Sequence, residues 1–99
     1  MLRDEIIAKV RPELTVLSEK YAVQEVYLFG SVARGEERPE SDVDFAIVFD
    51  KTRTVTLSTL GALKDHLTDL IGREADIGER AFIRPFARAD AESDMIRIE

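Results

Sequence analysis

The chain has 99 residues, no cysteine and a formal net charge of −6, with acidic and basic residues interspersed. A chain of this length forms one domain with a modest core, which buries roughly two-thirds of the surface of the unfolded chain. The lack of cysteine excludes disulfides and thiolate metal sites, and the acidic balance argues against nucleic acid as a direct ligand.

The N-terminus carries charges at Arg3, Asp4 and Glu5, where a signal peptide needs an apolar run. The longest apolar stretch is far too short to span a bilayer. We therefore expect one domain over residues 1–99, in a cytoplasmic protein without a membrane partner.

The first predicted element is an amphipathic helix over residues 2–21. Apolar residues recur there at three- and four-residue steps, at Leu2, Ile6, Val10, Leu14, Leu17 and Tyr21. Pro12 interrupts the pattern and is expected to kink or restart the helix. An apolar run follows and predicts a strand over residues 25–29.

The pair Gly30-Ser31 ends this strand and precedes a short predicted helix. Glycine lets backbone approach a ligand closely, while the Ser31 hydroxyl and the amides that open the helix can donate to anionic oxygens. A turn of this kind suits a phosphate group.

Two aspartates, Asp42 and Asp44, open the next predicted strand. Because side chains alternate along a strand, both carboxylates are expected on one face. Neighbouring carboxylates disfavour each other's ionisation, and a divalent cation relieves that repulsion. Together with the Gly-Ser turn, the pair predicts a magnesium and phosphate site.

A second amphipathic helix is predicted over residues 57–71, with Thr56 as N-cap and Gly72 after its last turn. Gly61 either weakens this helix or permits close packing. The alternating segment after it predicts a short strand that presents Asp76 away from its apolar neighbours. From the residues alone, Asp76 is either a third metal-site carboxylate or a surface acid. Glu74 points to the same face and is the alternative candidate for the third carboxylate.

Two further polar residues have simpler interpretations. His66 is the single histidine and has no potential ligand at metal spacing, so we expect an exposed surface residue rather than a catalytic base. Arg34 either contacts a triphosphate or pairs with an acid such as Glu36 or Asp42.

In the C-terminal segment, arginines and phenylalanines recur at four-residue steps. The repeating residues are Arg80, Arg84 and Arg88, with Phe82 and Phe86. They predict a helix in which either the phenylalanines cover the core and the arginines are solvated, or the basic stripe docks a partner. Residues 95–99 alternate like an edge strand or a partner-facing tail.

Two segments resemble the signature of the minimal nucleotidyltransferases of the polymerase-β-like superfamily. They are Gly30-Ser31-Val32-Ala33-Arg34-Gly35 and Ser41-Asp42-Val43-Asp44-Phe45. The resemblance extends from the first helix to about Asp76 and implies an α/β (α+β) fold, a small mixed sheet of about three strands flanked by helices. It also implies transfer of a nucleoside monophosphate from an NTP with two Mg²⁺ ions.

On this resemblance, Asp42, Asp44 and Asp76 are the expected catalytic and metal-binding carboxylates. The residues expected at the nucleotide are Gly30, Ser31 and Arg34, with Ser31 and the neighbouring amides at the β- and γ-phosphates.

Minimal nucleotidyltransferases of this kind often pair with a helical HEPN protein in a two-gene toxin–antitoxin module. The resemblance therefore implies a type VII-like antitoxin that transfers AMP from ATP to a hydroxyl of a HEPN toxin, typically of a tyrosine, within a hetero-oligomer. Two alternatives stay open. One is a catalytically silent antitoxin that acts by binding alone, and the other is a subunit of an enzyme that modifies a small molecule such as an aminoglycoside.

Overall fold

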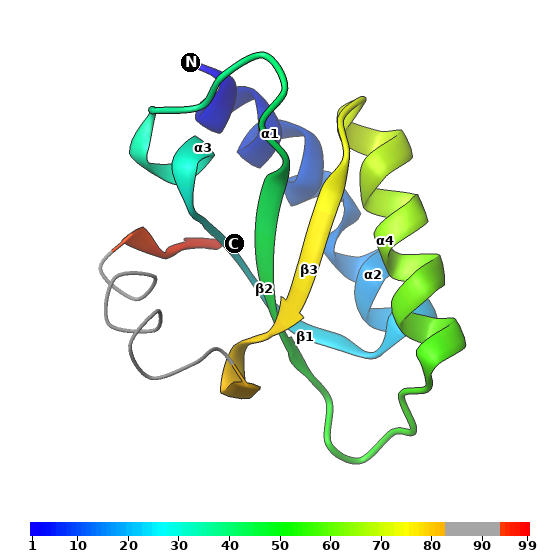
Figure 1. The fold of residues 1–99 in the computed structure, drawn as a ribbon. Coiled ribbons are helices and arrows are strands. Elements are labelled where there is room, and N and C mark those ends of the chain that lie inside the picture. The colour runs from blue at the N-terminus through cyan, green and yellow to red at the C-terminus, as the bar shows by residue number, and fades with distance from the viewer. Residues whose placement is uncertain (83–93) are drawn as a thin grey trace.

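The computed structural model describes residues 1–82 and 94–99, and its centre is a mixed sheet with strand order β3-β2-β1-β4 (Figure 1). The strands are β1 (Val23–Phe29), β2 (Val43–Phe49), β3 (Ala75–Glu79) and β4 (Ile96–Ile98). The helices are α1 (Leu2–Val10), η1 (Arg11–Glu13), α2 (Leu14–Tyr21), α3 (Ser31–Arg34), α4 (Leu57–Ile71) and η2 (Arg80–Phe82). In this part of the chain, no helix is long and apolar enough to cross a membrane.

The predicted N-terminal helix is divided where Pro12 stands. A short 3-10 turn, η1, separates α1 from α2, because proline has no N–H to continue the α-helical bonding. Ala22 then ends α2 in the left-handed conformation, with φ of 60°. The restart expected from Pro12 is confirmed.

The sheet combines both kinds of pairing. Strand β1 pairs antiparallel with β2 and β4, whereas β2 pairs parallel with β3. The expected mixed sheet flanked by helices is confirmed, but the strand count needs correction. The C-terminal residues add a fourth strand, in which Ile98 lies opposite Val26 and Ile96 opposite Leu28. Of the two interpretations for residues 95–99, the structure has the edge strand.

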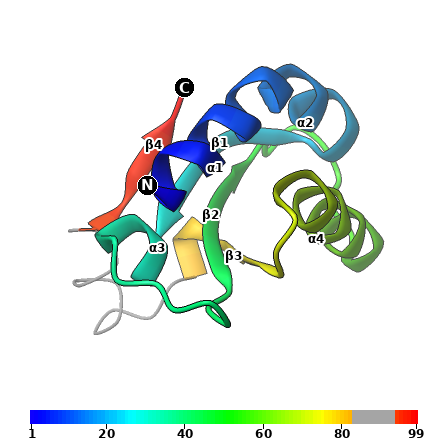
Figure 2. The ribbon, with the colours of Figure 1, turned by 90° about the horizontal axis from the view of Figure 1, so that it is seen from above.

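The two faces of the sheet differ in what they contact. Helices α1, α2 and α4 lie on one side (Figure 2), and the buried core forms there. Its largest fully buried side chains are Phe45, Ile6, Leu17, Leu28, Ile47, Leu63 and Leu67. The opposite side, here called the outer face, carries the intervening residues of the strands, among them Tyr27, Asp44 and Asp76. The two aspartates of the candidate site and the buried core thus lie on opposite faces of the sheet.

Helix α4 begins and ends as predicted. Thr56 accepts from the Thr59 N–H at 3.2 Å in a capping box, and Gly72 ends the helix with φ of 72°. Gly61 does not serve close packing, because an added Cβ would meet nothing within 4 Å.

The predicted C-terminal helix is only partly described. Residues 80–82 form the 3-10 turn η2 rather than an α-helix, and Phe82 is 79% exposed. The interpretation in which Phe82 covers the core is therefore wrong. Arg84, Phe86 and Arg88 lie outside the described residues.

Candidate active site

Asp44 and Asp76 are neighbours across the parallel pair of strands. They are register partners in β2 and β3, so their side chains share the outer face. Asp42 stands immediately before β2. Burial raises the pKa of Asp44 above its usual value, and the negative charges of Asp76 and then Asp42 raise it further, while Arg34 lowers it. The structure thus brings the three predicted carboxylates within electrostatic reach of one another.

Gly30 lies directly against the Asp44 carboxylate. Its φ of 79° falls in a region that favours glycine, and a Cβ at this position would clash with the Asp44 side chain. The close approach follows from pairing, because Asp44 is the register partner of Phe29, the residue before Gly30. Two constraints, one conformational and one steric, therefore require glycine at the turn.

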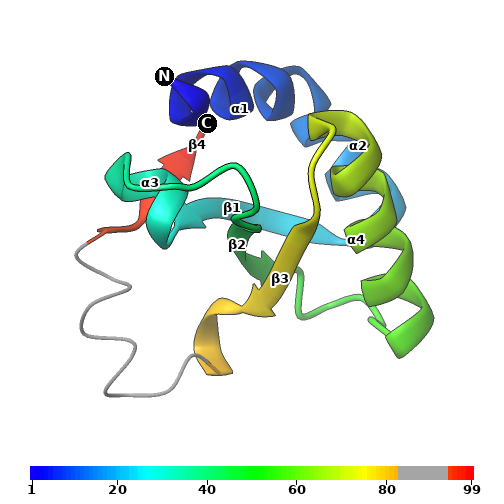
Figure 3. The same ribbon diagram turned by 45° about the horizontal axis from the view of Figure 1, so that its top comes forward.

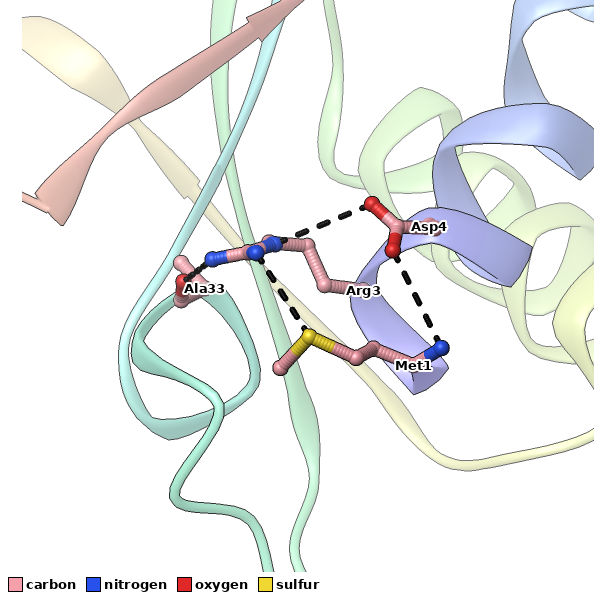
Figure 4. A network of polar contacts seen from close by, with 4 residues as sticks. All are labelled: Met1, Arg3, Asp4 and Ala33. Carbon is pink, nitrogen blue, oxygen red and sulfur yellow. Dashed lines mark hydrogen bonds and ion pairs between the residues drawn. The ribbon is translucent and has the colours of Figure 1, made fainter.

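Ser31 opens the single turn of α3, which is anchored by the buried side chains of Val32 and Ala33. In the described residues, the Ser31 hydroxyl has no hydrogen-bond partner. A guanidinium nitrogen of Arg3 in α1 donates to the Ala33 carbonyl at 3.0 Å (Figure 4). Arg3 of α1 thus fixes the turn, while the Ser31 hydroxyl is left able to bind a ligand.

Arg34 pairs with two acids in this structure. Its guanidinium lies 2.8 Å from Asp94 and 3.5 Å from Glu36, and these contacts, first the hydrogen bond with Asp94, raise the pKa of Arg34 above its usual value. Glu36 was one of the partners expected. Asp94 was not, because it lies sixty positions along the chain; Figure 3 shows α3 beside the segment that leads into β4.

Sequence reasoning missed the residue that braces the loop before Asp42. Arg73, which follows the Gly72 cap of α4, donates to the backbone carbonyls of Ser41 and Pro39, each at 3.2 Å. Ser41 itself accepts from the Arg38 N–H at 2.8 Å and closes the turn. No local pattern distinguishes Arg73 from any other surface arginine.

The start of β3 is fixed by its own contacts. The Ala75 N–H donates to the Thr68 hydroxyl at 3.0 Å, and the Val43 N–H donates to the Glu74 carbonyl at 3.0 Å. The Glu74 side chain instead pairs with Lys64 at 3.2 Å. Asp76, rather than the fallback Glu74, therefore lies in register with Asp44.

The carboxylates suit a hard cation in their chemistry. Magnesium prefers oxygen ligands, and a cation would relieve the repulsion that raises the pKa of Asp44. In residues 1–82 and 94–99, however, no three His, Cys, Asp or Glu side chains are gathered closely enough to hold a metal ion as they stand. Carboxylates are suitable ligands for a metal ion, and Asp44 and Asp76 lie on the same face of the sheet. The side chains are not yet arranged as a complete set of metal ligands.

His66 differs from the expectation of an exposed residue. Its ring nitrogens lie 2.9 Å from the Tyr21 hydroxyl and 3.2 Å from a Glu13 carboxylate oxygen, and its side chain is 20% exposed. It joins α4 to α2 and η1 on the helical side, away from the carboxylates. Its expected absence from catalysis remains a prediction.

Comparison with known proteins gives a consistent result. The model of a family described as the nucleotidyltransferase domain matches residues 11–98. A protein of Methanocaldococcus jannaschii, provisionally named a protein adenylyltransferase, is 33% identical over 95 residues, 95% of each chain. The solved structure of a provisionally assigned minimal nucleotidyltransferase has a TM-score of 0.75 at 32% identity and covers 97% of this chain and 95% of its own.

Two solved toxin–antitoxin complexes share the fold at lower identity. One, with AMP-PNP, gives a TM-score of 0.68 at 18% identity over 100% of this chain and 73% of the matched chain. The other, a tri-AMPylated HEPN toxin of Shewanella oneidensis with an MNT antitoxin, gives 0.59 at 16% identity over 99% and 69%.

Proposed function

The chain belongs to the nucleotidyltransferase domain family, and we propose that it transfers AMP from ATP to a hydroxyl of a HEPN-family toxin and so acts as an antitoxin. One observation carries the proposal. Asp44 and Asp76 lie in register on one face of the sheet, and Gly30 lies directly against Asp44. The turn that we propose for phosphate binding therefore adjoins two of the carboxylates that we propose as metal ligands, at one end of the sheet.

Asp42, Asp44 and Asp76 would hold the metal, for which we propose two magnesium ions. Bound there, magnesium neutralises phosphate charge and lowers the pKa of an attacking hydroxyl. The backbone carrying these residues is fixed by strand pairing and by the Arg73 brace. Binding would therefore require only that the carboxylates turn on that backbone.

The chain's own residues would position the triphosphate. The Ser31 hydroxyl has no partner in the described structure and would donate to a β- or γ-phosphate oxygen. Gly30, which has no side chain, lets the turn lie directly against the Asp44 carboxylate, so a phosphate bound at the turn would also be close to this proposed metal ligand. Arg34 would contribute positive charge near this turn, in addition to its pairs with Asp94 and Glu36. Positioning and charge neutralisation supply most of the rate acceleration in such reactions, so no protein nucleophile is needed.

The nature of the partner is supported by the relatives. The complexes that share the fold contain toxins, one of them an AMPylated HEPN protein, and the similar Methanocaldococcus protein is provisionally named for protein adenylylation. A HEPN toxin with an acceptor tyrosine is the corresponding partner here, in a hetero-oligomer.

Labelled ATP tests the proposal directly. The chain is incubated with Mg²⁺, the product of the adjacent gene and ATP labelled at the α- or the γ-phosphate, and label is located by intact mass and gel. We expect the α label on a partner tyrosine and release of pyrophosphate, because attack occurs in line at the α-phosphorus. Asp44→Asn is the matched inactive control.

The other outcomes distinguish the alternatives. A γ label on the partner would indicate a kinase-like reaction and contradict the proposal. A partner that is silenced in a tight complex without label would indicate an antitoxin that acts by binding alone. Transfer to an aminoglycoside but not to the partner would indicate a small-molecule enzyme.

A further inference from the structure

A cation–aromatic pair spans the outer face beside the carboxylates. The guanidinium carbon of Arg80 lies 4.9 Å from the centroid of the Tyr27 ring. Arg80 follows β3, whereas Tyr27 belongs to β1, and β2 lies between these strands. The Arg80 side chain therefore crosses β2, which presents the short side chain of Ala46 opposite Tyr27.

The position of Tyr27 is itself fixed. Its hydroxyl donates to Glu25, and Glu25 forms an ion pair of 3.8 Å with Arg97 of β4. The hydrogen bond with Glu25 raises the pKa of Tyr27 above its usual value. Arg80 thus stacks on a ring that is anchored to the two strands on the far side of β2.

Gly78 of β3 lies in the same cross-strand row as Tyr27, two residues along the strand from Asp76. Two residues beyond Asp44 and Asp76, the register partners are Ala46 and Gly78, and a Cβ at Gly78 would meet nothing within 4 Å. Glycine weakens a strand interior, and it often marks a place where a ligand approaches the backbone closely. Gly78 has no positive φ that would require glycine for conformational reasons.

These features follow one another in a fixed order along the sheet. The Gly30-Ser31 turn is at one end, the pair Asp44 and Asp76 comes next, and Gly78 with the Arg80–Tyr27 stack follows. Two strand residues span about 7 Å, which is the scale of one ribose. A nucleotide with its outer phosphates at the turn and its α-phosphate at the carboxylates would extend in this direction.

We infer that the nucleoside of the bound NTP lies over Gly78, with its base stacked against the guanidinium of Arg80. This inference rests on the proposed function and adds the site of the base to it. Arginine guanidinium planes and aromatic rings are common platforms for bases. Stacking tolerates different bases, because each of them has a π-face, so the subsite binds a nucleobase without needing an adenine-specific contact.

The test compares a nucleotide with a phosphate chain that lacks the nucleoside. Binding of AMP-PNP and of inorganic tripolyphosphate, each with Mg²⁺, is measured by calorimetry on the full chain. Gly78→Val should bind AMP-PNP about tenfold more weakly or worse, the loss of one base stack, with unchanged affinity for tripolyphosphate. Gly78→Ala should be intermediate, and both variants should melt at or above the wild-type temperature.

Gly61→Ala provides a control for the helical side of the sheet, where Gly61 and the Gly78 backbone line one pocket. An added Cβ there also meets nothing within 4 Å, so both affinities should stay at wild-type values. Arg80→Gln provides a second probe, which should weaken AMP-PNP binding and leave tripolyphosphate binding unchanged. If Arg80 contacted phosphate instead, both affinities would fall and the base assignment would be wrong.

The remaining outcomes separate this inference from the proposed function. Unchanged AMP-PNP affinity in Gly78→Val would overturn the inference alone, and loss of transfer in that variant would then locate the acceptor over Gly78. Equal affinity of the wild type for AMP-PNP and tripolyphosphate would also overturn it. A wild-type chain that binds neither ligand would overturn both proposals.

Discussion

At the scale of single residues, Asp44 determines how the site responds to pH. Its folded-state pKa is raised above 3.8, first by burial, so the folded chain holds this proton more tightly than the unfolded chain. The ionised carboxylate therefore costs stability at pH values above the raised pKa. As pH falls through that pKa toward the usual value, the cost disappears.

Asp44→Asn tests this electrostatic cost. The amide keeps the side-chain shape beside Gly30 but removes the charge, so transfer should be lost while the melting temperature at neutral pH equals or exceeds that of the wild type. The difference should shrink as the pH falls through the raised pKa of Asp44 toward the usual value of an aspartate, because the wild-type carboxylate then becomes protonated. Thermal melts of both proteins across this range provide the measurement. A variant that loses both activity and fold would point to a structural role for Asp44.

The spacing of residues made part of the site predictable. Asp44 and Asp76 could be assigned to strand positions on one face because strand periodicity is local, and the register of β2 with β3 confirms that arrangement for this pair. Asp42 was predicted to open the same strand but stands just before β2. Arg73, Thr68 and Asp94 could not be identified, since each acts on a residue far away in the chain or through backbone atoms. The contacts of these three residues arise from the tertiary fold, and local sequence patterns do not encode them.

At the scale of elements, one polar contact adds to the apolar packing of α4 on α2. His66 bridges the Tyr21 hydroxyl and Glu13, and the rings of His66 and Tyr21 meet edge to face with centroids 5.5 Å apart. The amphipathic pattern correctly predicted that both helices bury an apolar side. The pattern did not predict that His66, next to the apolar side of α4, would also be half-buried. The residues that contact it, Tyr21 and Glu13, come from other elements.

His66→Phe should retain the ring contact and remove both hydrogen bonds. The free energy of unfolding should fall by about 1–2 kcal/mol, mainly because the half-buried Tyr21 hydroxyl loses its partner. AMP transfer should be unaffected, since the contact lies on the helical side. In urea titrations, the double variant with Tyr21→Phe should be less destabilised than the sum of the two single variants. Strict additivity would argue against a shared hydrogen bond.

Elements that depend on distant pairing were harder to predict. Three residues suffice for β4 only because Ile96 and Ile98 pair beside Leu28 and Val26. The alternation of residues 95–99 was compatible with an edge strand or a partner-facing tail. An isolated strand of this length is not stable, so only its pairing decides between the two. Conversely, Thr56 and Gly72 identified both ends of α4 without tertiary information, because capping is local.

At the scale of the whole molecule, the sheet separates the residues that stabilise the fold from those proposed for catalysis. Ligands on the outer face should therefore stabilise the chain without rearranging its core. Mg²⁺ with AMP-PNP at about one hundred times its Kd should add about 2.7 kcal/mol to the free energy of unfolding. A thermal-shift experiment measures this gain, and EDTA should abolish it.

Two variants sharpen that measurement. Asp44→Asn should show little or no shift, because it lacks one of the proposed metal ligands, whereas His66→Phe should start lower and shift by the wild-type amount. A shift that persists in EDTA would mean that the nucleotide binds without the metal, contrary to the proposed site.

The contact between Gly30 and Asp44 also restricts how this protein can evolve or be redesigned. Any side chain at position 30 displaces the carboxylate at position 44, so a library that randomises either position alone will sample almost only inactive sequences. A viable new catalyst would have to change the turn and the strand together. In relatives that have lost the proposed activity, positions 30 and 44 should therefore begin to vary together.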